Sequence, residues 1–397
     1  MKQVYIFNPQ NDLALATGGI NYVAPPFAMH MAHDLAVLPA FLAEPGSLLI
    51  TDSDLDAEWL EYLNTTFGLD VHAIKRSQLR QLANCRIMPW GWSLDLRRRL
   101  IKWGAANDCL PSKEQVNHLR GLSHRRVSIL IHMRLKELLG RQLCPMPVEL
   151  AVADDVLDFV RQHRKCFIKT PWSNSGRGIY HTINGASPEL EQWCLGALKR
   201  QGSLLCEQAL DNIMDLGVEF YCENGKTIAR GYSLFSTDSH SQYDHGIVAE
   251  EKELKARITA LYPNFDEVVA ALTQVLNELI APHYEGWLGV DMLLYNAQCI
   301  KHNAQFSNST LGTGINPCVE LNLRPTMGAI TSVIGNKMLV SGTTSVFRIE
   351  QRSTANKPWP QSKEAVIKNG HLISGTLQLT PPNPTALYRA VLDYKED

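Results

Sequence analysis

Short apolar runs alternate with amphipathic segments along the N-terminal part of the chain. Three runs have the length and residue types of strands: residues 4–7, 47–50 and 71–74. Strands that alternate with helices are typical of a parallel sheet. The pattern therefore predicts an α/β domain over residues 1–118, which ends where Pro111 and Gly121 interrupt the alternation.

A second, smaller α/β pattern covers residues 119–205. Val152, Val156 and Val160 recur at helical spacing, so they predict one apolar stripe on a helix. An apolar strand at 166–170 follows and leads into a loop rich in Gly and Ser. The next helix should begin at Ser187, because Ser is a good N-cap and Pro188 suits the first helical position.

Strand-like runs dominate after residue 205, interrupted by one long amphipathic segment at 265–280. This order predicts an antiparallel sheet backed by helices over residues 206–340. The segment 296–317 is rich in Asn, Ser, Thr and Gly, so we expect a long hairpin insertion there. Residues 341–397 form a C-terminal extension with one predicted strand at 371–379.

The charge balance, hydropathy and cysteine content of the chain limit the kinds of partner and the cellular location that we expect. The 38 basic and 40 acidic residues nearly cancel and form no long single-sign run, which argues against nucleic acid or a charged membrane surface as partner. No apolar run approaches the roughly 18 residues of a transmembrane helix, and no signal-peptide core follows the N-terminus. Nine scattered cysteines without a C-x-x-C pair indicate reduced thiols. We expect a cytoplasmic protein that binds small molecules.

The segment 318–324 carries the most informative polar pattern. Side chains alternate between the two faces of a strand, so Glu320, Asn322 and Arg324 should project from the same face. Two oxygen ligands beside a fixed cation suit a Mg²⁺-phosphate site. Asp291 becomes a third ligand if its strand pairs with this one as an antiparallel hairpin. The alternative is that these residues only form the solvated face of a half-exposed sheet.

Two further segments have the residue types of a nucleotide site. Lys169 ends an apolar strand just before a loop of small residues, where backbone N–H groups can approach phosphate oxygens closely. A strand that ends in Glu207 and Gln208 offers backbone groups to an adenine edge. The alternatives are an ordinary surface turn with two solvated cations, and a buried strand that happens to end in Glu.

Taken in order, K-x-P-x-S-x-S-G-R-G, E-Q-x-L, G-x-E, D and E-x-N-x-R resemble the ATP-grasp superfamily over about residues 123–335. The resemblance implies an α+β ATP-grasp fold preceded by a Rossmann-like α/β domain. It also implies roles for single residues. Lys169 and Arg324 would be catalytic, and the metal ligands would be Asp291, Glu320 and Asn322. The nucleotide would be held by Arg126, Lys169, Ser175, Gly176, Arg177, Gly178, Glu207, Gln208, Leu210 and Glu219.

Arg126 is the departure from the family pattern, because many members carry a lysine where this chain has Arg126 before a helix. The resemblance implies ATP and Mg²⁺ as cofactors, with Mn²⁺ as an alternative metal, and is compatible with a homodimer. The expected activity is a ligase that activates a carboxylate as an acyl phosphate for attack by an amine or another nucleophile. A small-molecule kinase and a non-catalytic ATP-binding module remain open as alternatives.

Three other groups of polar residues attract attention. Asn8, Asn11 and Asp12 follow the first strand, where parallel sheets bind ligands, although turn chemistry is the more common reason for such residues at this place. His30 and His33 lie one helical turn apart but lack a third ligand. The segment 244–246 follows a serine-rich loop and is either an acceptor contact or, as we favour, a mobile surface loop.

Overall fold

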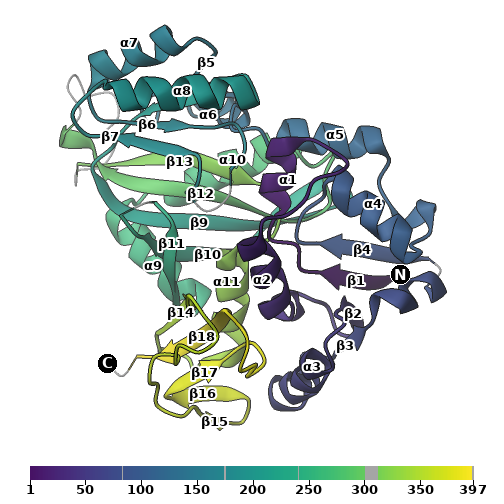
Figure 1. Cartoon of the computed structure of the whole chain (residues 1–397). Helices are drawn as coiled ribbons and strands as arrows, with labels where there is room; N and C mark the ends of the chain where they lie inside the picture. Colours follow the sequence, from purple (N-terminus) through teal and green to yellow (C-terminus); the bar gives the residue numbers. More distant parts are fainter. Residues whose placement is uncertain (83, 174–175, 240, 300–311, 396–397) are drawn as a thin grey trace.

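The computed structural model describes residues 1–82, 84–173, 176–239, 241–299 and 312–395. Three main sheets organise the chain (Figure 1). A parallel sheet holds the N-terminal part, a small antiparallel sheet lies at the opposite end of the molecule, and a large antiparallel sheet runs between them to the C-terminal strands. The molecule is thus of mixed α/β class.

The N-terminal sheet is parallel, in the order β3-β2-β1-β4, as the alternating pattern predicts. Its strands are β1 (Lys2–Ile6), β2 (Ser47–Ile50), β3 (Val71–Ile74) and β4 (Cys85–Pro89). The α-helices of this part are α1 (Asn11–Thr17), α2 (Pro26–Asp34), α3 (Asp54–Phe67), α4 (Leu94–Trp103) and α5 (Lys113–Leu122). The short helix α1 was not expected, because its first residues read as a turn. The Rossmann-like classification of this domain stays a prediction.

Local sequence explains the helix limits in this domain. Ser53 caps α3 by accepting a hydrogen bond from the Asp56 N–H, and Gly68 ends it in the left-handed conformation. The segment from Pro26 to Phe41 forms two separate helical elements. Helix α2 ends at Asp34, and a 3₁₀ turn follows at Leu38–Phe41, where Pro39 cannot continue a helical hydrogen-bond ladder.

The small sheet is antiparallel, in the order β5-β8-β6-β7. Its strands are β5 (Val148–Leu150), β6 (Cys166–Lys169), β7 (Ile179–Thr182) and β8 (Leu204–Gln208), and its helices are α6 (Val127–Leu139), α7 (Ala153–His163) and α8 (Pro188–Gln201). Val156 and Val160 are fully buried between α7 and the sheet, as their spacing predicts. Val152 precedes the helix and is 53% exposed, so its place in the stripe was wrong.

The large sheet has the order β13-β12-β9-β10-β11-β14-β18-β17, with every neighbouring pair antiparallel. Its first five members along the chain are β9 (Asn212–Glu223), β10 (Lys226–Thr237), β11 (Tyr243–Val248), β12 (Gly286–Asn296) and β13 (Thr313–Asn322). The helices α9 (Glu251–Leu261), α10 (Phe265–Leu279) and α11 (Met327–Met338) pack against it. The predicted antiparallel sheet backed by helices is confirmed.

The C-terminal extension joins the same large sheet through β14 (Ser345–Gln351), β17 (Thr376–Gln378) and β18 (Tyr388–Tyr394). A separate two-stranded ribbon is formed by β15 (Val366–Lys368) and β16 (His371–Ser374). The strand expected at 371–379 is interrupted at Gly375, whose φ of +80° disfavours other residues. The domain limits predicted from sequence remain predictions.

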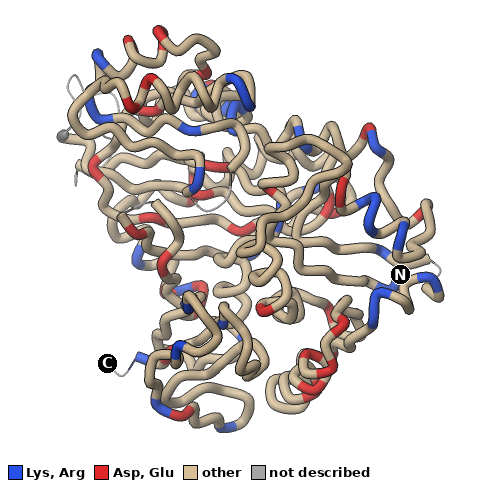
Figure 2. The backbone as a smooth tube through the Cα atoms, viewed as in Figure 1, with Lys and Arg blue, Asp and Glu red and all other residues tan. Residues whose placement is uncertain are grey.

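Charged residues of both signs are interspersed along the backbone, and the charged residues of α3 are all acidic (Figure 2). Within the described ranges, no helix combines the length and apolar character needed to cross a membrane.

Candidate active site

Asp291 and Glu320 lie directly opposite each other on β12 and β13, and Gly289 pairs with Asn322 two positions along. The hairpin predicted from sequence is therefore confirmed. Asn322 donates a hydrogen bond from Nδ2 to Asp291 Oδ2 at 3.0 Å, which leaves its carbonyl oxygen as a ligand atom. Burial, followed by the charge of Glu320, raises the pKa of Asp291 to about 7. These two facing carboxylates repel each other when both are ionised, so a positive charge near them would stabilise the pair.

The donor set fits a hard divalent cation such as Mg²⁺, because two carboxylates and one amide oxygen can bind it while phosphate and water complete the shell. In the part of the chain that the structure describes, no group of three or more His, Cys, Asp or Glu side chains is placed to hold a metal. The amide of Asn322 is therefore needed to make a third protein ligand.

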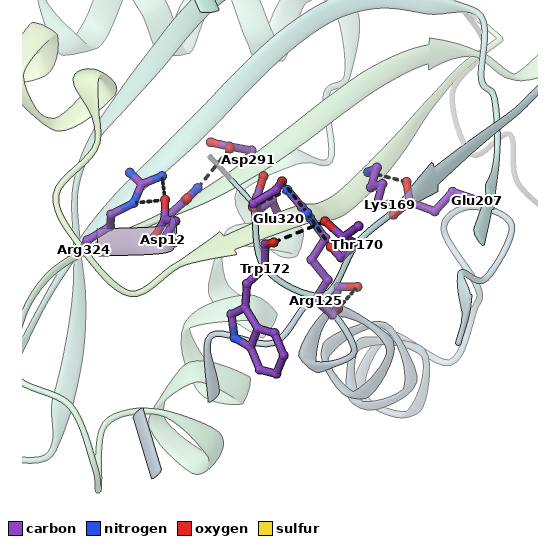
Figure 3. A network of polar contacts seen from close by, with 12 residues as sticks. Asp12, Arg125, Lys169, Thr170, Trp172, Glu207, Asp291, Glu320 and Arg324 are labelled. Atoms are coloured by element: carbon purple, nitrogen blue, oxygen red, sulfur yellow. Dashed lines mark hydrogen bonds and ion pairs between the residues drawn. The ribbon is translucent and has the colours of Figure 1, made fainter. Parts of the chain in front are cut away.

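Arg125 supplies the nearest fixed positive charge to Glu320. Its Nη2 donates to Glu320 Oε1 at 2.8 Å, and its Nη1 donates to Thr170 O at 2.7 Å and Ser173 Oγ at 2.8 Å (Figure 3). The side chain of Arg125 is only 4% exposed. Burial alone raises the pKa of Glu320, but the charges of Arg125, Lys169 and Arg324 together bring it below its usual value. Glu320 is therefore held ionised.

Arg125 was missed by sequence reasoning, which assigned the phosphate role to its neighbour. The Arg126 side chain is 54% exposed, and its Nη1 lies 3.8 Å from Glu149, away from Glu320. The signal that distinguishes the two arginines is the helical spacing of buried residues. Arg125, Ser128, His132 and Leu135 recur every three or four positions along the start of α6 and are all buried, whereas Arg126 falls outside that series.

Lys169 and Glu207, predicted separately for phosphate and adenine, are joined in the structure. Lys169 Nζ lies 2.7 Å from Glu207 Oε2, and both side chains are largely buried. They come together because β6 and β8 are antiparallel neighbours, with Phe167 opposite Glu207. Lys169 also acts electrostatically on Glu320 across the two sheets. A cation thus lies at the junction of the nucleotide and metal parts of the site.

The remaining predicted adenine contacts lie close to Glu207. Gln208 is the last residue of β8, opposite Cys166, and is half-buried. Leu210 packs against the small cluster of Cys144, Tyr295 and Ala297, so its side chain serves the core.

The glycine loop after β6 is tightly packed at its far end. A Cβ added at Gly178 would lie 2.4 Å from Thr170 Oγ1, and its φ is +89°, so glycine is required there. Gly176 also has a positive φ, of +72°. The guanidinium of Arg177 stacks on the Phe27 ring of α2, with 3.6 Å between them. Ser175 lies outside the described residues.

Arg324 contacts the N-terminal domain. Its Nε and Nη2 each lie 2.9 Å from Asp12 Oδ2 on α1 (Figure 3). Burial lowers the pKa of Arg324, but Asp12 and the other acids raise it above its usual value, so the cation is retained. Asn11, Asp12, Trp172, Glu320 and Arg324 border a cavity of about 20 Å³. Asp12 therefore belongs to the site, whereas Asn8 holds the loop at Gly91 by donating to its carbonyl at 2.7 Å.

Glu219 lies opposite Gly289 on the neighbouring strand β9 and is enclosed by polar side chains. It is 1% exposed and accepts hydrogen bonds from Thr326 Oγ1 at 2.7 Å and Ser233 Oγ at 2.9 Å. Burial raises the pKa of Glu219 to about 7. A Cβ added at Gly289 would lie 2.5 Å from Thr326 Cγ2 and 2.8 Å from Glu219 Oε2, so the space beside this glycine is already filled.

Two other candidates have ordinary partners. His33 pairs with its neighbour Asp34 at 3.0 Å, and no metal-binding cluster includes it within the described residues. The segment 244–246 lies in β11, where Gly246 pairs with Phe235 and Phe347, so the expected mobile surface loop was wrong.

No protein-family model matches the sequence, and a search of curated proteins finds no match either. The structure is similar to that of biotin carboxylase from Campylobacter jejuni in complex with β-γ-ATP. That similarity covers 100% of this chain and 88% of that chain, with a TM-score of 0.53 and 12% identity. The chain therefore has the ATP-grasp fold, as the order of its motifs predicts.

Two weaker similarities are to other synthetases. One is N5-carboxyaminoimidazole synthetase from Staphylococcus aureus complexed with ADP, with 12% identity, a TM-score of 0.45, and coverage of 88% of this chain and 82% of that chain. The other is D-alanyl-alanine synthetase A from Vibrio cholerae, with 14% identity, a TM-score of 0.41, and coverage of 74% of this chain and 93% of that chain.

Proposed function

We propose that the chain is an ATP- and Mg²⁺-dependent ligase that activates a carboxylate as an acyl phosphate and passes the acyl group to an amine or a related nucleophile. The observation that carries this proposal is the cross-strand pair of Asp291 and Glu320. It is surrounded by three basic side chains, Arg125, Lys169 and Arg324, that come from different elements. Paired acids beside fixed cations suit a bound metal with transferring phosphate.

The nucleotide would lie between the small sheet and the large sheet, as the resemblance implies. Lys169 would contact its phosphates, which requires Glu207 to share or release the ammonium that it now binds at 2.7 Å. The glycine loop 176–178 would cover the phosphates. Mg²⁺ held by Asp291, Glu320 and Asn322 would offset phosphate charge and polarise the transferred group.

In the first chemical step, an oxygen of the substrate carboxylate bonds to the γ-phosphorus, and the bond from that phosphorus to the bridging oxygen of ADP breaks. In the second, the nucleophile bonds to the acyl carbon, inorganic phosphate leaves, and the nucleophile loses a proton. Negative charge builds up on oxygens in both steps. Arg324, fixed by Asp12, and Arg125, fixed by Glu320, are preorganised cations for those oxygens.

ADP release tests this proposal. We expect Mg²⁺-ATP turnover to be stimulated by at least one pool of amino acids, dipeptides or small carboxylic acids, with inorganic phosphate released in equal amount. Lys169→Ala should abolish the stimulation, and Lys165→Ala should not, because Lys165 is an exposed residue just before the same strand. Transfer of phosphate to a stable ester would indicate a kinase instead. Absence of ATP binding would overturn the proposal.

A further inference from the structure

A second and larger cavity lies outside the nucleotide and metal site. It has a volume of about 430 Å³ and is bordered by β4, the loop 90–92, α5 and the turn 281–287 that precedes β12. Ligand pockets commonly have volumes of about 300 to 1,000 Å³ and often lie between domains. This cavity has both properties, because β4 and α5 belong to the predicted N-terminal domain and the turn belongs to the large-sheet domain.

Aromatic side chains form much of its wall. The rings are those of Tyr5, Trp90, Trp92, Tyr284 and Trp287. Most of the other lining residues are apolar. Such walls favour a flat ring that can stack or make edge contacts.

The basic group of the wall is paired with acids. Arg86 Nη2 lies 2.9 Å from Glu285 Oε2, and Arg86 Nη1 lies 3.5 Å from Glu223 Oε1. Among the described lining residues, these ion pairs leave no free guanidinium or ammonium group to bind an anion. An uncharged occupant therefore fits the wall better than a phosphate.

Hydrogen-bond donors remain available around the cavity. Among the described residues, no protein acceptor is found for the indole N–H groups of Trp90, Trp92 and Trp287, and none of the three is a fully buried, unsatisfied donor. Trp172, at 8% exposure, differs because its Nε1 donates to Arg120 O at 3.0 Å. Accessible donors that the protein leaves free around a cavity suit a ligand that carries acceptors.

The cavity is adjacent to the catalytic residues without including them. Leu323 borders both this cavity and the small cavity beside Arg324. The loop 90–92 lines the larger cavity, and Asn8 fixes it through the 2.7 Å bond to Gly91 O. An occupant would therefore bind next to the active site and independently of the metal ligands.

We infer that this cavity is a second small-molecule site for an uncharged, planar heteroaromatic ring that bears nitrogen or carbonyl acceptors. The aromatic side chains of the wall favour a flat ring, the free indole N–H groups favour acceptors, and the pairing of Arg86 with two glutamates disfavours an anion. The inference does not depend on the proposed ligase activity, since none of these groups contacts the metal site.

Three uncharged probes of similar size test it: nicotinamide, benzamide and cyclohexanecarboxamide. We expect nicotinamide to shift the indole signals of Trp92 and Trp287 in NMR spectra of the full chain with isotope-labelled tryptophan, and to leave Trp193 on α8 unchanged. Benzamide should bind more weakly because it lacks the ring nitrogen. Cyclohexanecarboxamide should bind at least about tenfold more weakly than nicotinamide, since it cannot stack. The indole signals of Trp92 and Trp287 are assigned by their disappearance in the Trp92→Phe and Trp287→Phe variants.

A filled-cavity variant provides the control. Leu119→Trp places a large ring in the cavity from α5 and should abolish the shifts, whereas Asn117→Trp, on the exposed side of the same helix, should preserve them. Lys169→Ala should also preserve them. Equal binding of the saturated and aromatic probes, unchanged shifts in Leu119→Trp, or no shift with any probe in the folded parent chain would each overturn the inference.

Discussion

Arg324 and Asp12 connect the two ends of the site across more than three hundred residues of sequence. Both Nε and Nη2 of the arginine lie 2.9 Å from the same carboxylate oxygen of α1. A guanidinium bound by two of its nitrogens has little freedom to rotate. Helix α1 therefore orients the cation for which the ATP-grasp resemblance implies a catalytic role.

Asp12→Asn should lower turnover about 10- to 100-fold, the usual effect of removing a group that orients a functional side chain. The amide keeps the shape and one acceptor but removes the charge. ATP affinity should change little, because Asp12 lies on the Arg324 side of the site and not beside Lys169. Stimulated ADP release and ATP titration by calorimetry measure the two quantities. Weakened ATP binding with unchanged turnover at saturation would contradict this role.

Arg125→Ala and Arg126→Ala test which arginine serves the site. The structure indicates Arg125, and the family pattern indicates Arg126. Arg125 is 4% exposed and donates to Glu320, Thr170 O and Ser173 Oγ, so its removal should lower the free energy of unfolding by about 1 to 3 kcal/mol. Arg126 is 54% exposed and sits 3.8 Å from Glu149, so its loss should change stability by at most about 0.5 kcal/mol. Urea unfolding measures both. Equal destabilisation by the two changes would show that Arg125 is not the buried cation of the site.

Regular side-chain periodicity is the reason that the sequence could predict both the order of strands and helices and the candidate metal ligands. Strand side chains alternate strictly, so Glu320 and Asn322 had to share a face, and the observed register then placed Asp291 beside them. The sequence could not show which of Arg125 and Arg126 enters the site, since that depends on which residue faces the sheet at the start of α6. It also could not predict the contacts of Asp12 with Arg324 and of Lys169 with Glu207, because such contacts depend on the packing of distant elements.

Glu320→Gln should abolish the Mg²⁺ dependence of ATP turnover while leaving the chain folded. The amide removes the charge that a divalent cation requires but can still accept the hydrogen bond from Arg125. We expect turnover to fall by at least about 100-fold, in line with loss of a principal transition-state charge interaction.

Glu350→Gln is its matched control, because Glu350 is also a paired carboxylate but binds Arg389 on β18, away from the site. That variant should retain turnover and its Mg²⁺ dependence. Circular dichroism and thermal unfolding establish that both variants are folded. Full Mg²⁺-dependent turnover in Glu320→Gln would remove Glu320 from the metal ligands.

The raised pKa of Asp291 predicts an unusual dependence of stability on pH. Its pKa rises from the model-compound value of 3.8 to about 7 in the folded chain, so the folded state binds more protons than the unfolded state between those limits. Stability without metal should therefore fall as pH rises through this window, by at most about 1.4 kcal/mol per pH unit for one such group. Glu219, with a pKa of about 7, acts in the same direction.

Asp291→Asn isolates the contribution of Asp291, since an amide does not ionise. In the metal-free protein, the fall in free energy of unfolding between about pH 5 and pH 7 should be smaller in the variant than in the parent. Mg²⁺ should then stabilise the parent more at about pH 8 than at about pH 5, because a ligand carboxylate must be deprotonated to bind it. Urea unfolding across pH, with and without Mg²⁺, measures both effects. A parent and variant with identical pH profiles would mean that Asp291 titrates normally in the folded chain.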